Sequence, residues 1–270
     1  MARKTTLKCT KSSLNLLLFL LCFWALARFT HHETSGFRLT KLEGNSSPLP
    51  SQLPPSLAAE EKRAIDALFS APFTYLGRGK QSFAFLSEDG TTVLKLFIPN
   101  ERKEKLKATF ESYQLAFDLL KEESGLLYFH PQEGEDKFPS VTLIDRLAIA
   151  HPLDLNSKGF LLQRRAILTY DYLSTKTEEE ATAAIYALIA LLRSKMDKGI
   201  ADSDPLLRAN VGFVGNCPIQ IDLGPLKKDQ TLRSKEKQRE VLVSATLALK
   251  HWLEKNRPEL VKVLGDAIEP

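Results

Sequence analysis

The spacing of apolar and polar residues changes several times along the chain. Residues 1–30 have a basic start followed by an unbroken apolar run from Ser12 to Ala27. Residues 31–56 are rich in Pro, Ser and Gly and follow no regular period, which predicts a flexible linker. From residue 57 onward apolar positions recur at strand or helix spacing, so the folded part is expected there.

The apolar run predicts a targeting segment. Basic residues precede it, and Ala25-Leu26-Ala27 has the small-x-small form of an export cleavage site. A bilayer-spanning helix needs about 20 apolar residues, and this run is shorter. The bulky Phe23 and Trp24 beside the proposed cut leave an uncleaved signal-anchor open as the alternative. Residues 1–30 are therefore predicted to export the protein or to anchor it to a membrane, on a side that the sequence leaves undecided.

Residues 73–99 change to short alternating runs, with Asp89-Gly90 as a hairpin turn. This pattern predicts three antiparallel strands. The first turn is rich in glycine, and the third strand carries Lys95 between two leucines. A lysine placed in this way either extends along a sheet edge or is held for an anion.

Later segments favour helices. Asn100 is placed to cap an amphipathic helix on which Glu111 lies next to the apolar stripe. Two further strands are expected between residues 138 and 168, and an alanine-rich helix ends at Gly199. A strand pair turns at Gly215-Asn216, and two helices close the chain. These elements predict a strand-rich part over 57–165 and a mainly helical part over 166–270.

Composition adds limits to this picture. The chain of 270 residues is 43% hydrophobic, which is enough for a substantial core. The net charge is +4, and part of this positive charge lies in the basic start. The rest of the chain is close to neutral, so its charge does not favour nucleic acid as a partner. Of three cysteines only Cys217 lies outside the targeting region. We expect this thiol to pack as a small hydrophobic group.

The order of motifs from Phe73 to Gly224 resembles the protein-kinase-like fold. The stretch Gly77-Arg78-Gly79-Lys80-Gln81-Ser82 is similar to the loop that covers ATP phosphates, and Val93-Leu94-Lys95 to the strand of the phosphate-binding lysine. Ile221-Asp222-Leu223-Gly224 is similar to the DFG element, twelve residues after Asn210. The resemblance implies an α+β fold with a small antiparallel-sheet N-lobe and a shortened, mainly helical C-lobe.

The same resemblance implies ATP and Mg²⁺ as cofactors. Phosphate oxygens need close backbone N–H donors, a positioned ammonium and divalent cations. On the nucleotide side the implied residues are Gly77, Gly79, Ser82, Lys95 and Glu111, with Glu111 as the partner of Lys95. Asn210 and Asp222 are the implied magnesium ligands.

The chain departs from the family at the catalytic loop. The family places an aspartate five positions before the asparagine, where this chain has Pro205. Asp204 is our first choice for the base that orients the acceptor hydroxyl, and Asp202 is the second. The alternative is that both aspartates shape the turn before Pro205. The chain after Gly224 is also too short for a full protein-kinase C-lobe and has no Ala-Pro-Glu.

Two functional hypotheses follow. The first is a divergent kinase that uses ATP and Mg²⁺ to phosphorylate an unknown acceptor. The second is a membrane-associated pseudokinase, a binding or scaffold module without catalysis. The predicted partners are a nucleotide, a membrane through the N-terminal segment, and an unknown acceptor or partner protein. An α+β binding protein with an accidental resemblance is the third possibility.

Overall fold

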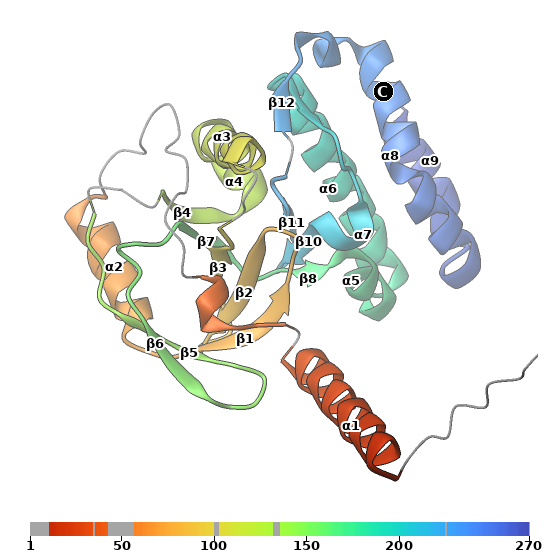
Figure 1. Cartoon of the computed structure of the whole chain (residues 1–270). Helices are drawn as coiled ribbons and strands as arrows, with labels where there is room; N and C mark the ends of the chain where they lie inside the picture. Colours follow the sequence, from red (N-terminus) through yellow and green to blue (C-terminus); the bar gives the residue numbers. More distant parts are fainter. Residues whose placement is uncertain are drawn as a thin grey trace, which may run out of the picture.

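A computed structural model describes residues 11–34, 36–42, 57–99, 103–131, 136–224 and 226–269. A sheet-rich part and a helical part lie side by side, and one N-terminal helix projects away from both (Figure 1). This arrangement confirms the α+β class, with the seven strands of the large sheet before residue 165 and the long helices α6 and α8 after it. Asn100, proposed as a helix cap, lies outside the described residues.

The first part is built on a seven-stranded sheet in the order β4-β7-β3-β2-β1-β5-β6. Its strands are β1 (Phe73–Arg78), β2 (Ser82–Ser87), β3 (Thr92–Phe97), β4 (Leu126–His130), β5 (Val141–Ile144), β6 (Ala150–Leu153) and β7 (Phe160–Arg164). The predicted hairpins β1–β2 and β2–β3 form, and Gly90 has a φ of 72° in the second turn. The sequence analysis missed β4, whose apolar residues do not alternate with polar ones.

The two faces of the sheet have different coverings. Side chains alternate along each strand, so Leu94 and Leu96 lie on one face and Lys95 on the other. The leucine face packs in one core cluster with Ile65 and Phe69 of helix α2 (Ala59–Phe69). The opposite face packs against helix α3 (Lys103–Leu119), which is followed by the short α4 (Lys121–Ser124). Lys95 therefore faces α3 and the helical part.

The helical part holds the remaining elements: β8 (Ile167–Leu168), α5 (Thr169–Thr175), α6 (Glu178–Asp197), β9 (Ile200–Asp202), α7 (Leu207–Asn210), β10 (Val211–Val214), β11 (Cys217–Gln220), β12 (Leu226–Lys228), η2 (Gln230–Arg233), α8 (Lys235–Asn256) and α9 (Leu260–Ile268). Thr177 caps α6 by accepting a hydrogen bond from Glu180 N at 3.2 Å. Gly199, with a φ of 70°, follows its end as predicted. Helices α6, α8 and α9 share one apolar core.

The predicted linker 31–56 is corrected in part. Helix α1 (Lys11–Glu33) is followed by residues 36–42, in which Phe37 and Leu42 are buried against the sheet. The ring of Phe37 lies 5.2 Å from Phe83 and 5.4 Å from Phe85 between centroids. Burial of apolar surface holds this segment in place despite the polar residues around it. In the described part of the chain, no helix combines the length and apolarity needed to cross a membrane.

A second expectation fails at Cys217. This residue begins β11 and its side chain is exposed, so it is not packed as a small hydrophobic group. The turn Gly215-Asn216 brings it to the surface, where β10 pairs with β11. Cys22 on α1 is also exposed, and both thiols are free.

Candidate functional site

Lys95 is the central residue of the candidate site. It lies on β3 opposite Ala84 of β2 and Leu161 of β7. Its Nζ donates a hydrogen bond of 2.6 Å to the backbone oxygen of Ile221, which comes directly before Asp222. Burial lowers the pKa of Lys95 to about 8, and the nearby Asp222 carboxylate opposes that shift. The ammonium thus lies in a largely desolvated position with a carbonyl as its hydrogen-bond acceptor.

The glycine-rich turn lies on the same face of the sheet as Lys95. The strand register places Gly77 opposite Ala84, and Ala84 opposite Lys95, and cross-strand neighbours point to the same side. A Cβ added at Gly77 would meet no atom within 4 Å, and one at Gly79 would come no closer than 3.7 Å to Ser82 O. Neither glycine has a positive φ. Neither packing nor backbone conformation requires glycine here, and the space beside the turn is open.

Contacts within the protein hold the turn in shape. The N–H of Gly79 donates to Ser82 O at 2.8 Å, which closes the hairpin. Gln81 accepts a hydrogen bond of 2.6 Å from the hydroxyl of Thr109 on α3. Ile98 N also donates to Gln81 O at 2.8 Å. The turn is therefore tied to both β3 and α3.

Helix α3 positions the Asp222 loop through Ser112. The Ser112 hydroxyl donates to Leu223 O at 2.6 Å and to Gly224 O at 2.5 Å, and it accepts from Leu226 N at 2.9 Å. Asp222 Oδ1 accepts from Gly224 N at 3.0 Å, and the residue is exposed. A carboxylate is thus presented to solvent by a loop whose backbone is fixed.

Asn210 joins this loop to the predicted catalytic loop. Its backbone oxygen accepts from Ile221 N at 2.7 Å, and its Nδ2 donates to Asp204 O at 2.8 Å. Its amide oxygen bonds to none of the described residues. Asp204 is exposed, and within the described ranges its carboxylate makes no hydrogen bond or ion pair. Both side chains therefore retain oxygens for a ligand.

Asp202 is committed to a different network. Its Oδ2 accepts from Gln220 Nε2 at 2.5 Å and lies 3.3 Å from Nζ of Lys195. Lys195 also donates to Gln220 Oε1. Its side chain is nearly fully buried, and that burial lowers the pKa of Lys195, with Asp202 opposing the shift. Asp202 therefore compensates a buried cation, which leaves Asp204 as the accessible carboxylate of the two.

Glu111 does not lie with Lys95. It is exposed on α3 and its Oε1 lies 3.8 Å from Nζ of Lys107, one turn away. The buried face of α3 carries Phe110, Ser112 and Tyr113 instead. Successive helical residues are about 100° apart, so Glu111 points away from the face that Phe110 and Tyr113 bury. The expected Lys95–Glu111 pair is therefore replaced by the contact between Lys95 and Ile221 O.

The structure thus brings Lys95, Asn210, Asp204 and Asp222 together. Gly77 lies on the same face of the sheet as Lys95, two strands away, with Ala84 between them. Ser82 begins β2 on the far side of the turn. No group of three or more His, Cys, Asp or Glu residues suited to a metal occurs among the described residues. Asn210 and Asp222 would supply two oxygen ligands, which suits a magnesium ion that also binds phosphate.

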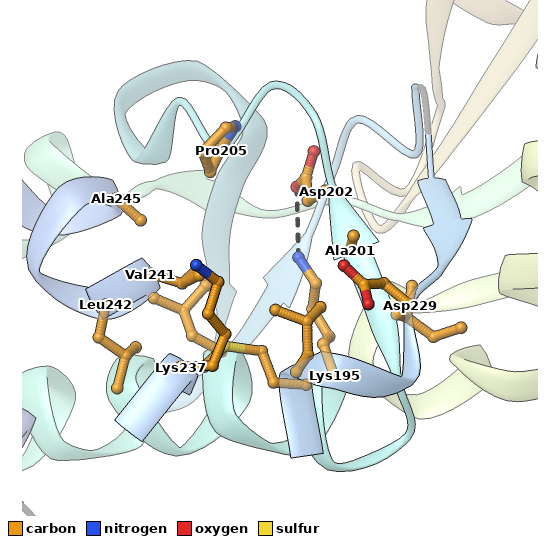
Figure 2. Close-up of a pocket in the computed structure, with 13 residues that line it drawn as sticks. Lys195, Ala201, Asp202, Pro205, Asp229, Lys237, Val241, Leu242 and Ala245 are labelled. Carbon is orange, nitrogen blue, oxygen red and sulfur yellow. Dashed lines mark hydrogen bonds and ion pairs between the residues drawn. The ribbon is translucent and has the colours of Figure 1, made fainter. Parts of the chain in front are cut away.

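A separate cavity lies behind this site. It has a volume of about 220 Å³, opens to solvent on one side and is lined by residues of α6, β9, η2 and α8, with Asp202 and Pro205 in its wall (Figure 2). Lys95, Asn210 and Asp222 do not line it. The cavity therefore adjoins the Lys95 site at the 202–205 loop, whose Asp202 and Pro205 line it and whose Asp204 is held by Asn210.

Sequence analysis missed three residues that organise the site, namely Lys195, Gln220 and Ser112. Lys195 was detectable, because it falls at helical spacing from Leu188 and Leu192 on the buried face of an apolar helix. Gln220 lies between two isoleucines at a strand end, and Ser112 lies in an amphipathic helix. Polar residues in such positions call for a buried partner.

No family model and no curated protein matches the chain. Among solved structures, it is similar to the streptomycin-ATP-APH(2″)-IIa ternary complex, with 14% identity over 80% of this chain and 97% of that chain and a TM-score of 0.37. It is also similar to WbdD, solved with the kinase inhibitor LY294002, with 14% identity over 72% of this chain and 45% of that chain and a TM-score of 0.37. Likenesses this weak carry no argument. The site is characterised by its own geometry, in an α+β fold.

Proposed function

We propose that the chain is a divergent phosphotransferase that binds ATP and Mg²⁺ and phosphorylates a hydroxyl group. The observation that carries the proposal is the position of Lys95, whose Nζ lies 2.6 Å from the backbone oxygen next to Asp222. A lysine that joins a sheet to an aspartate loop, beside an open glycine turn, is suited to a phosphorylated ligand.

The site fits a nucleotide on two counts. The buried ammonium of Lys95 has its pKa lowered to about 8, so an anion placed beside it would recover part of the lost solvation energy. The space at Gly77 and Gly79 allows phosphate oxygens to approach the backbone of the turn without a Cβ between them. Lys95 and the turn would hold the phosphates from one side.

The aspartate side fits a divalent cation and a base. The Asn210 amide oxygen and the Asp222 carboxylate are hard oxygen ligands of the kind Mg²⁺ prefers. ATP supplies the phosphoryl group, and the cation spreads its charge. The exposed carboxylate of Asp204 accepts the proton of the attacking hydroxyl and orients that oxygen. The Nδ2 of Asn210 donates a 2.8 Å hydrogen bond to the backbone oxygen of Asp204 and thereby fixes the backbone at that residue.

A nucleotide-binding module without catalysis is the second candidate. Two observations favour it: Glu111 pairs with Lys107 rather than Lys95, and Asp202 is held by Lys195 and Gln220. In this alternative, Lys95 and Asp222 still bind nucleotide, but no group activates an acceptor. The two candidates thus share a ligand and differ in the role of Asp204.

Thermal unfolding of the full chain with ATP and MgCl₂ tests nucleotide binding. Ligand at 100 times its dissociation constant adds about 2.7 kcal/mol to the free energy of unfolding. Lys95→Met and Asp222→Ala should lose that increment, while Lys107→Met, which removes an exposed lysine of α3, should keep it. No stabilisation of the wild type at millimolar ATP would refute both candidates. Binding that survives in Asp204→Asn while ATP turnover falls would separate the kinase from the binding module.

The N-terminal segment is proposed to direct export or to hold the chain at a membrane. Apolar side chains of α1 are exposed on all sides, including Phe19 at 67% and Trp24 at 59% of their full area. Such a surface needs a covering. Mass spectrometry of the mature N-terminus would decide the cleavage question, because removal after Ala27 leaves the buried Phe37 segment intact.

A further inference from the structure

The cavity behind the 202–205 loop is mostly apolar. Its walls are formed chiefly by Leu192, Met196, Ile200, Leu232, Val241 and Leu242. A cavity of about 150 Å³ with similar walls binds benzene in a well-studied engineered protein. The volume here, about 220 Å³, is sufficient for a single ring or a short alkyl chain.

The charged residues around the cavity favour a neutral ligand. They are two lysines and two aspartates, Lys195, Lys237, Asp202 and Asp229. Lys195 pairs with Asp202 at 3.3 Å, and Lys237 pairs with Glu240 at 2.7 Å. Asp229 accepts a hydrogen bond from Thr231, and the nearby charge of Lys237 opposes that of its carboxylate. No charge at the rim is left to attract a charged head group, whereas a hydroxyl can donate to a carboxylate and accept from an ammonium.

We propose that this cavity binds the apolar part of a neutral alcohol and that this alcohol is the phosphoryl acceptor. The second half of the proposal rests on the proposed function. The 202–205 loop links the two halves of the proposal. Its Asp202 and Pro205 line the cavity (Figure 2). Asp204, between them in the sequence, carries the accessible carboxylate. In Figure 2, Asp202 and Pro205 of the loop border one end of the space, and Val241, Leu242 and Ala245 of α8 border one side.

The step balances without a further reagent. The alcohol oxygen forms a bond to the γ-phosphorus of ATP as the bond from that phosphorus to the ADP oxygen breaks. The hydroxyl proton passes to the Asp204 carboxylate, and the products are ADP and an alkyl phosphate. No electron transfer is involved.

The chain offers a specific probe of the cavity. It has two methionines, Met1 and Met196, and Met196 lines the cavity. In the full chain labelled with ¹³C at the methionine methyl groups, titration with 1-hexanol should shift the Met196 signal saturably and leave Met1 unchanged. Hexanoate and hexylamine, which carry the same chain with a charge, should produce no saturable shift.

Matched variants on α8 provide the control. Ala245→Phe fills the cavity and should weaken 1-hexanol binding by about tenfold or more, whereas Ala248→Phe adds the same ring at an exposed position and should leave it unchanged. If Ala245→Phe does not fold, Ala245→Leu makes the same test with less added volume. Equal affinity in the folded cavity variant and the control would refute binding in the cavity.

Failure of this inference can be told apart from failure of the proposed function. A wild type stabilised by ATP but without a saturable Met196 shift would overturn the alcohol site alone. A saturable shift without ATP stabilisation would keep the cavity as a ligand site and overturn the acceptor role. With both present, ³¹P NMR should detect alkyl phosphate from 1-hexanol or benzyl alcohol and show its loss in Ala245→Phe. Absence of alkyl phosphate from both alcohols would also overturn the acceptor role.

Discussion

Lys95 in the sheet part and Lys195 in the helical part are both shielded from solvent, and the two lysines have different surroundings. Lys195 of α6 meets a carboxylate and an amide, Asp202 and Gln220, inside the protein. Lys95 of β3 meets a backbone carbonyl, and the carboxylate of Asp222 nearby is exposed to solvent. Burial lowers the pKa of both. A buried charge that the protein compensates is structural, and one that it leaves partly uncompensated indicates a place for an anion.

Removal of the two lysines should give the largest contrast. Lys195→Met leaves Asp202 without its cation and should lower the free energy of unfolding by about 3 to 5 kcal/mol. Lys95→Met removes both the cost of a desolvated charge and one hydrogen bond to a carbonyl. These two effects oppose each other, so the free energy of unfolding should fall by less than in Lys195→Met. Urea denaturation of both variants measures the difference. Equal losses would break the distinction between a structural lysine and a ligand-binding lysine.

The pH dependence of stability should follow from the lowered pKa of Lys95. The unfolded chain binds this proton up to pH 10.5, whereas the folded chain releases it at about 8. Between these values the unfolded state holds more protons, so stability should rise with pH, by at most about 1.4 kcal/mol per unit. Lys95→Met should flatten this rise. An unchanged slope in the variant would show that Lys95 does not cause it.

Nucleotide affinity should have the opposite dependence on pH. Bound phosphate favours the protonated ammonium of Lys95. ATP affinity should therefore fall as the pH rises through about 8, the pKa of Lys95 in the folded protein without nucleotide. Calorimetric titrations at pH 7 and pH 9 measure the change. Lys95→Arg stays charged across this range, and any affinity that it retains should be independent of pH.

Loss of the Ser112 hydroxyl should produce a moderate effect. Ser112→Ala removes one donor and one acceptor from the Asp222 loop and should lower the free energy of unfolding by about 1 to 2 kcal/mol. ATP affinity should fall with it, because Asp222 loses its support. Ser174→Ala, at an exposed position with a local hydrogen bond, is the control and should leave ATP affinity unchanged.

The smallest change in stability is expected at Gly77. Gly77→Ala introduces a Cβ that meets no protein atom, so the free energy of unfolding should stay within about 0.5 kcal/mol. ATP affinity should fall because the methyl group occupies space proposed for phosphate. Gly265→Ala, where an added Cβ also meets nothing, should leave ATP affinity unaffected. Unaltered affinity in Gly77→Ala would place the ligand elsewhere.

Much of the sheet and the order of the motifs could be predicted, because both depend on local spacing. Alternation of apolar residues placed Lys95 on a strand beside a glycine turn, and the structure has it there. The side-chain partners could not be predicted in the same way. Glu111 was chosen for its closeness to the apolar stripe, but the rotation of α3 directs Ser112 and Tyr113 inward instead. The sequence also could not show which of Asp202 and Asp204 is accessible. Lys195 forms an ion pair with Asp202, whereas Asp204 is exposed.

By itself, the sequence determined the first three strands, the long helices and the apolar character of the N-terminal run, because periodicity and composition act over short distances. Only the tertiary structure decided that Phe37 packs into the sheet, that Lys95 reaches Ile221 and that Lys195 compensates Asp202. These contacts join residues from distant segments or different elements. They depend on which surfaces become buried together, and burial determines whether a charge must be paired within the protein or is left for a ligand.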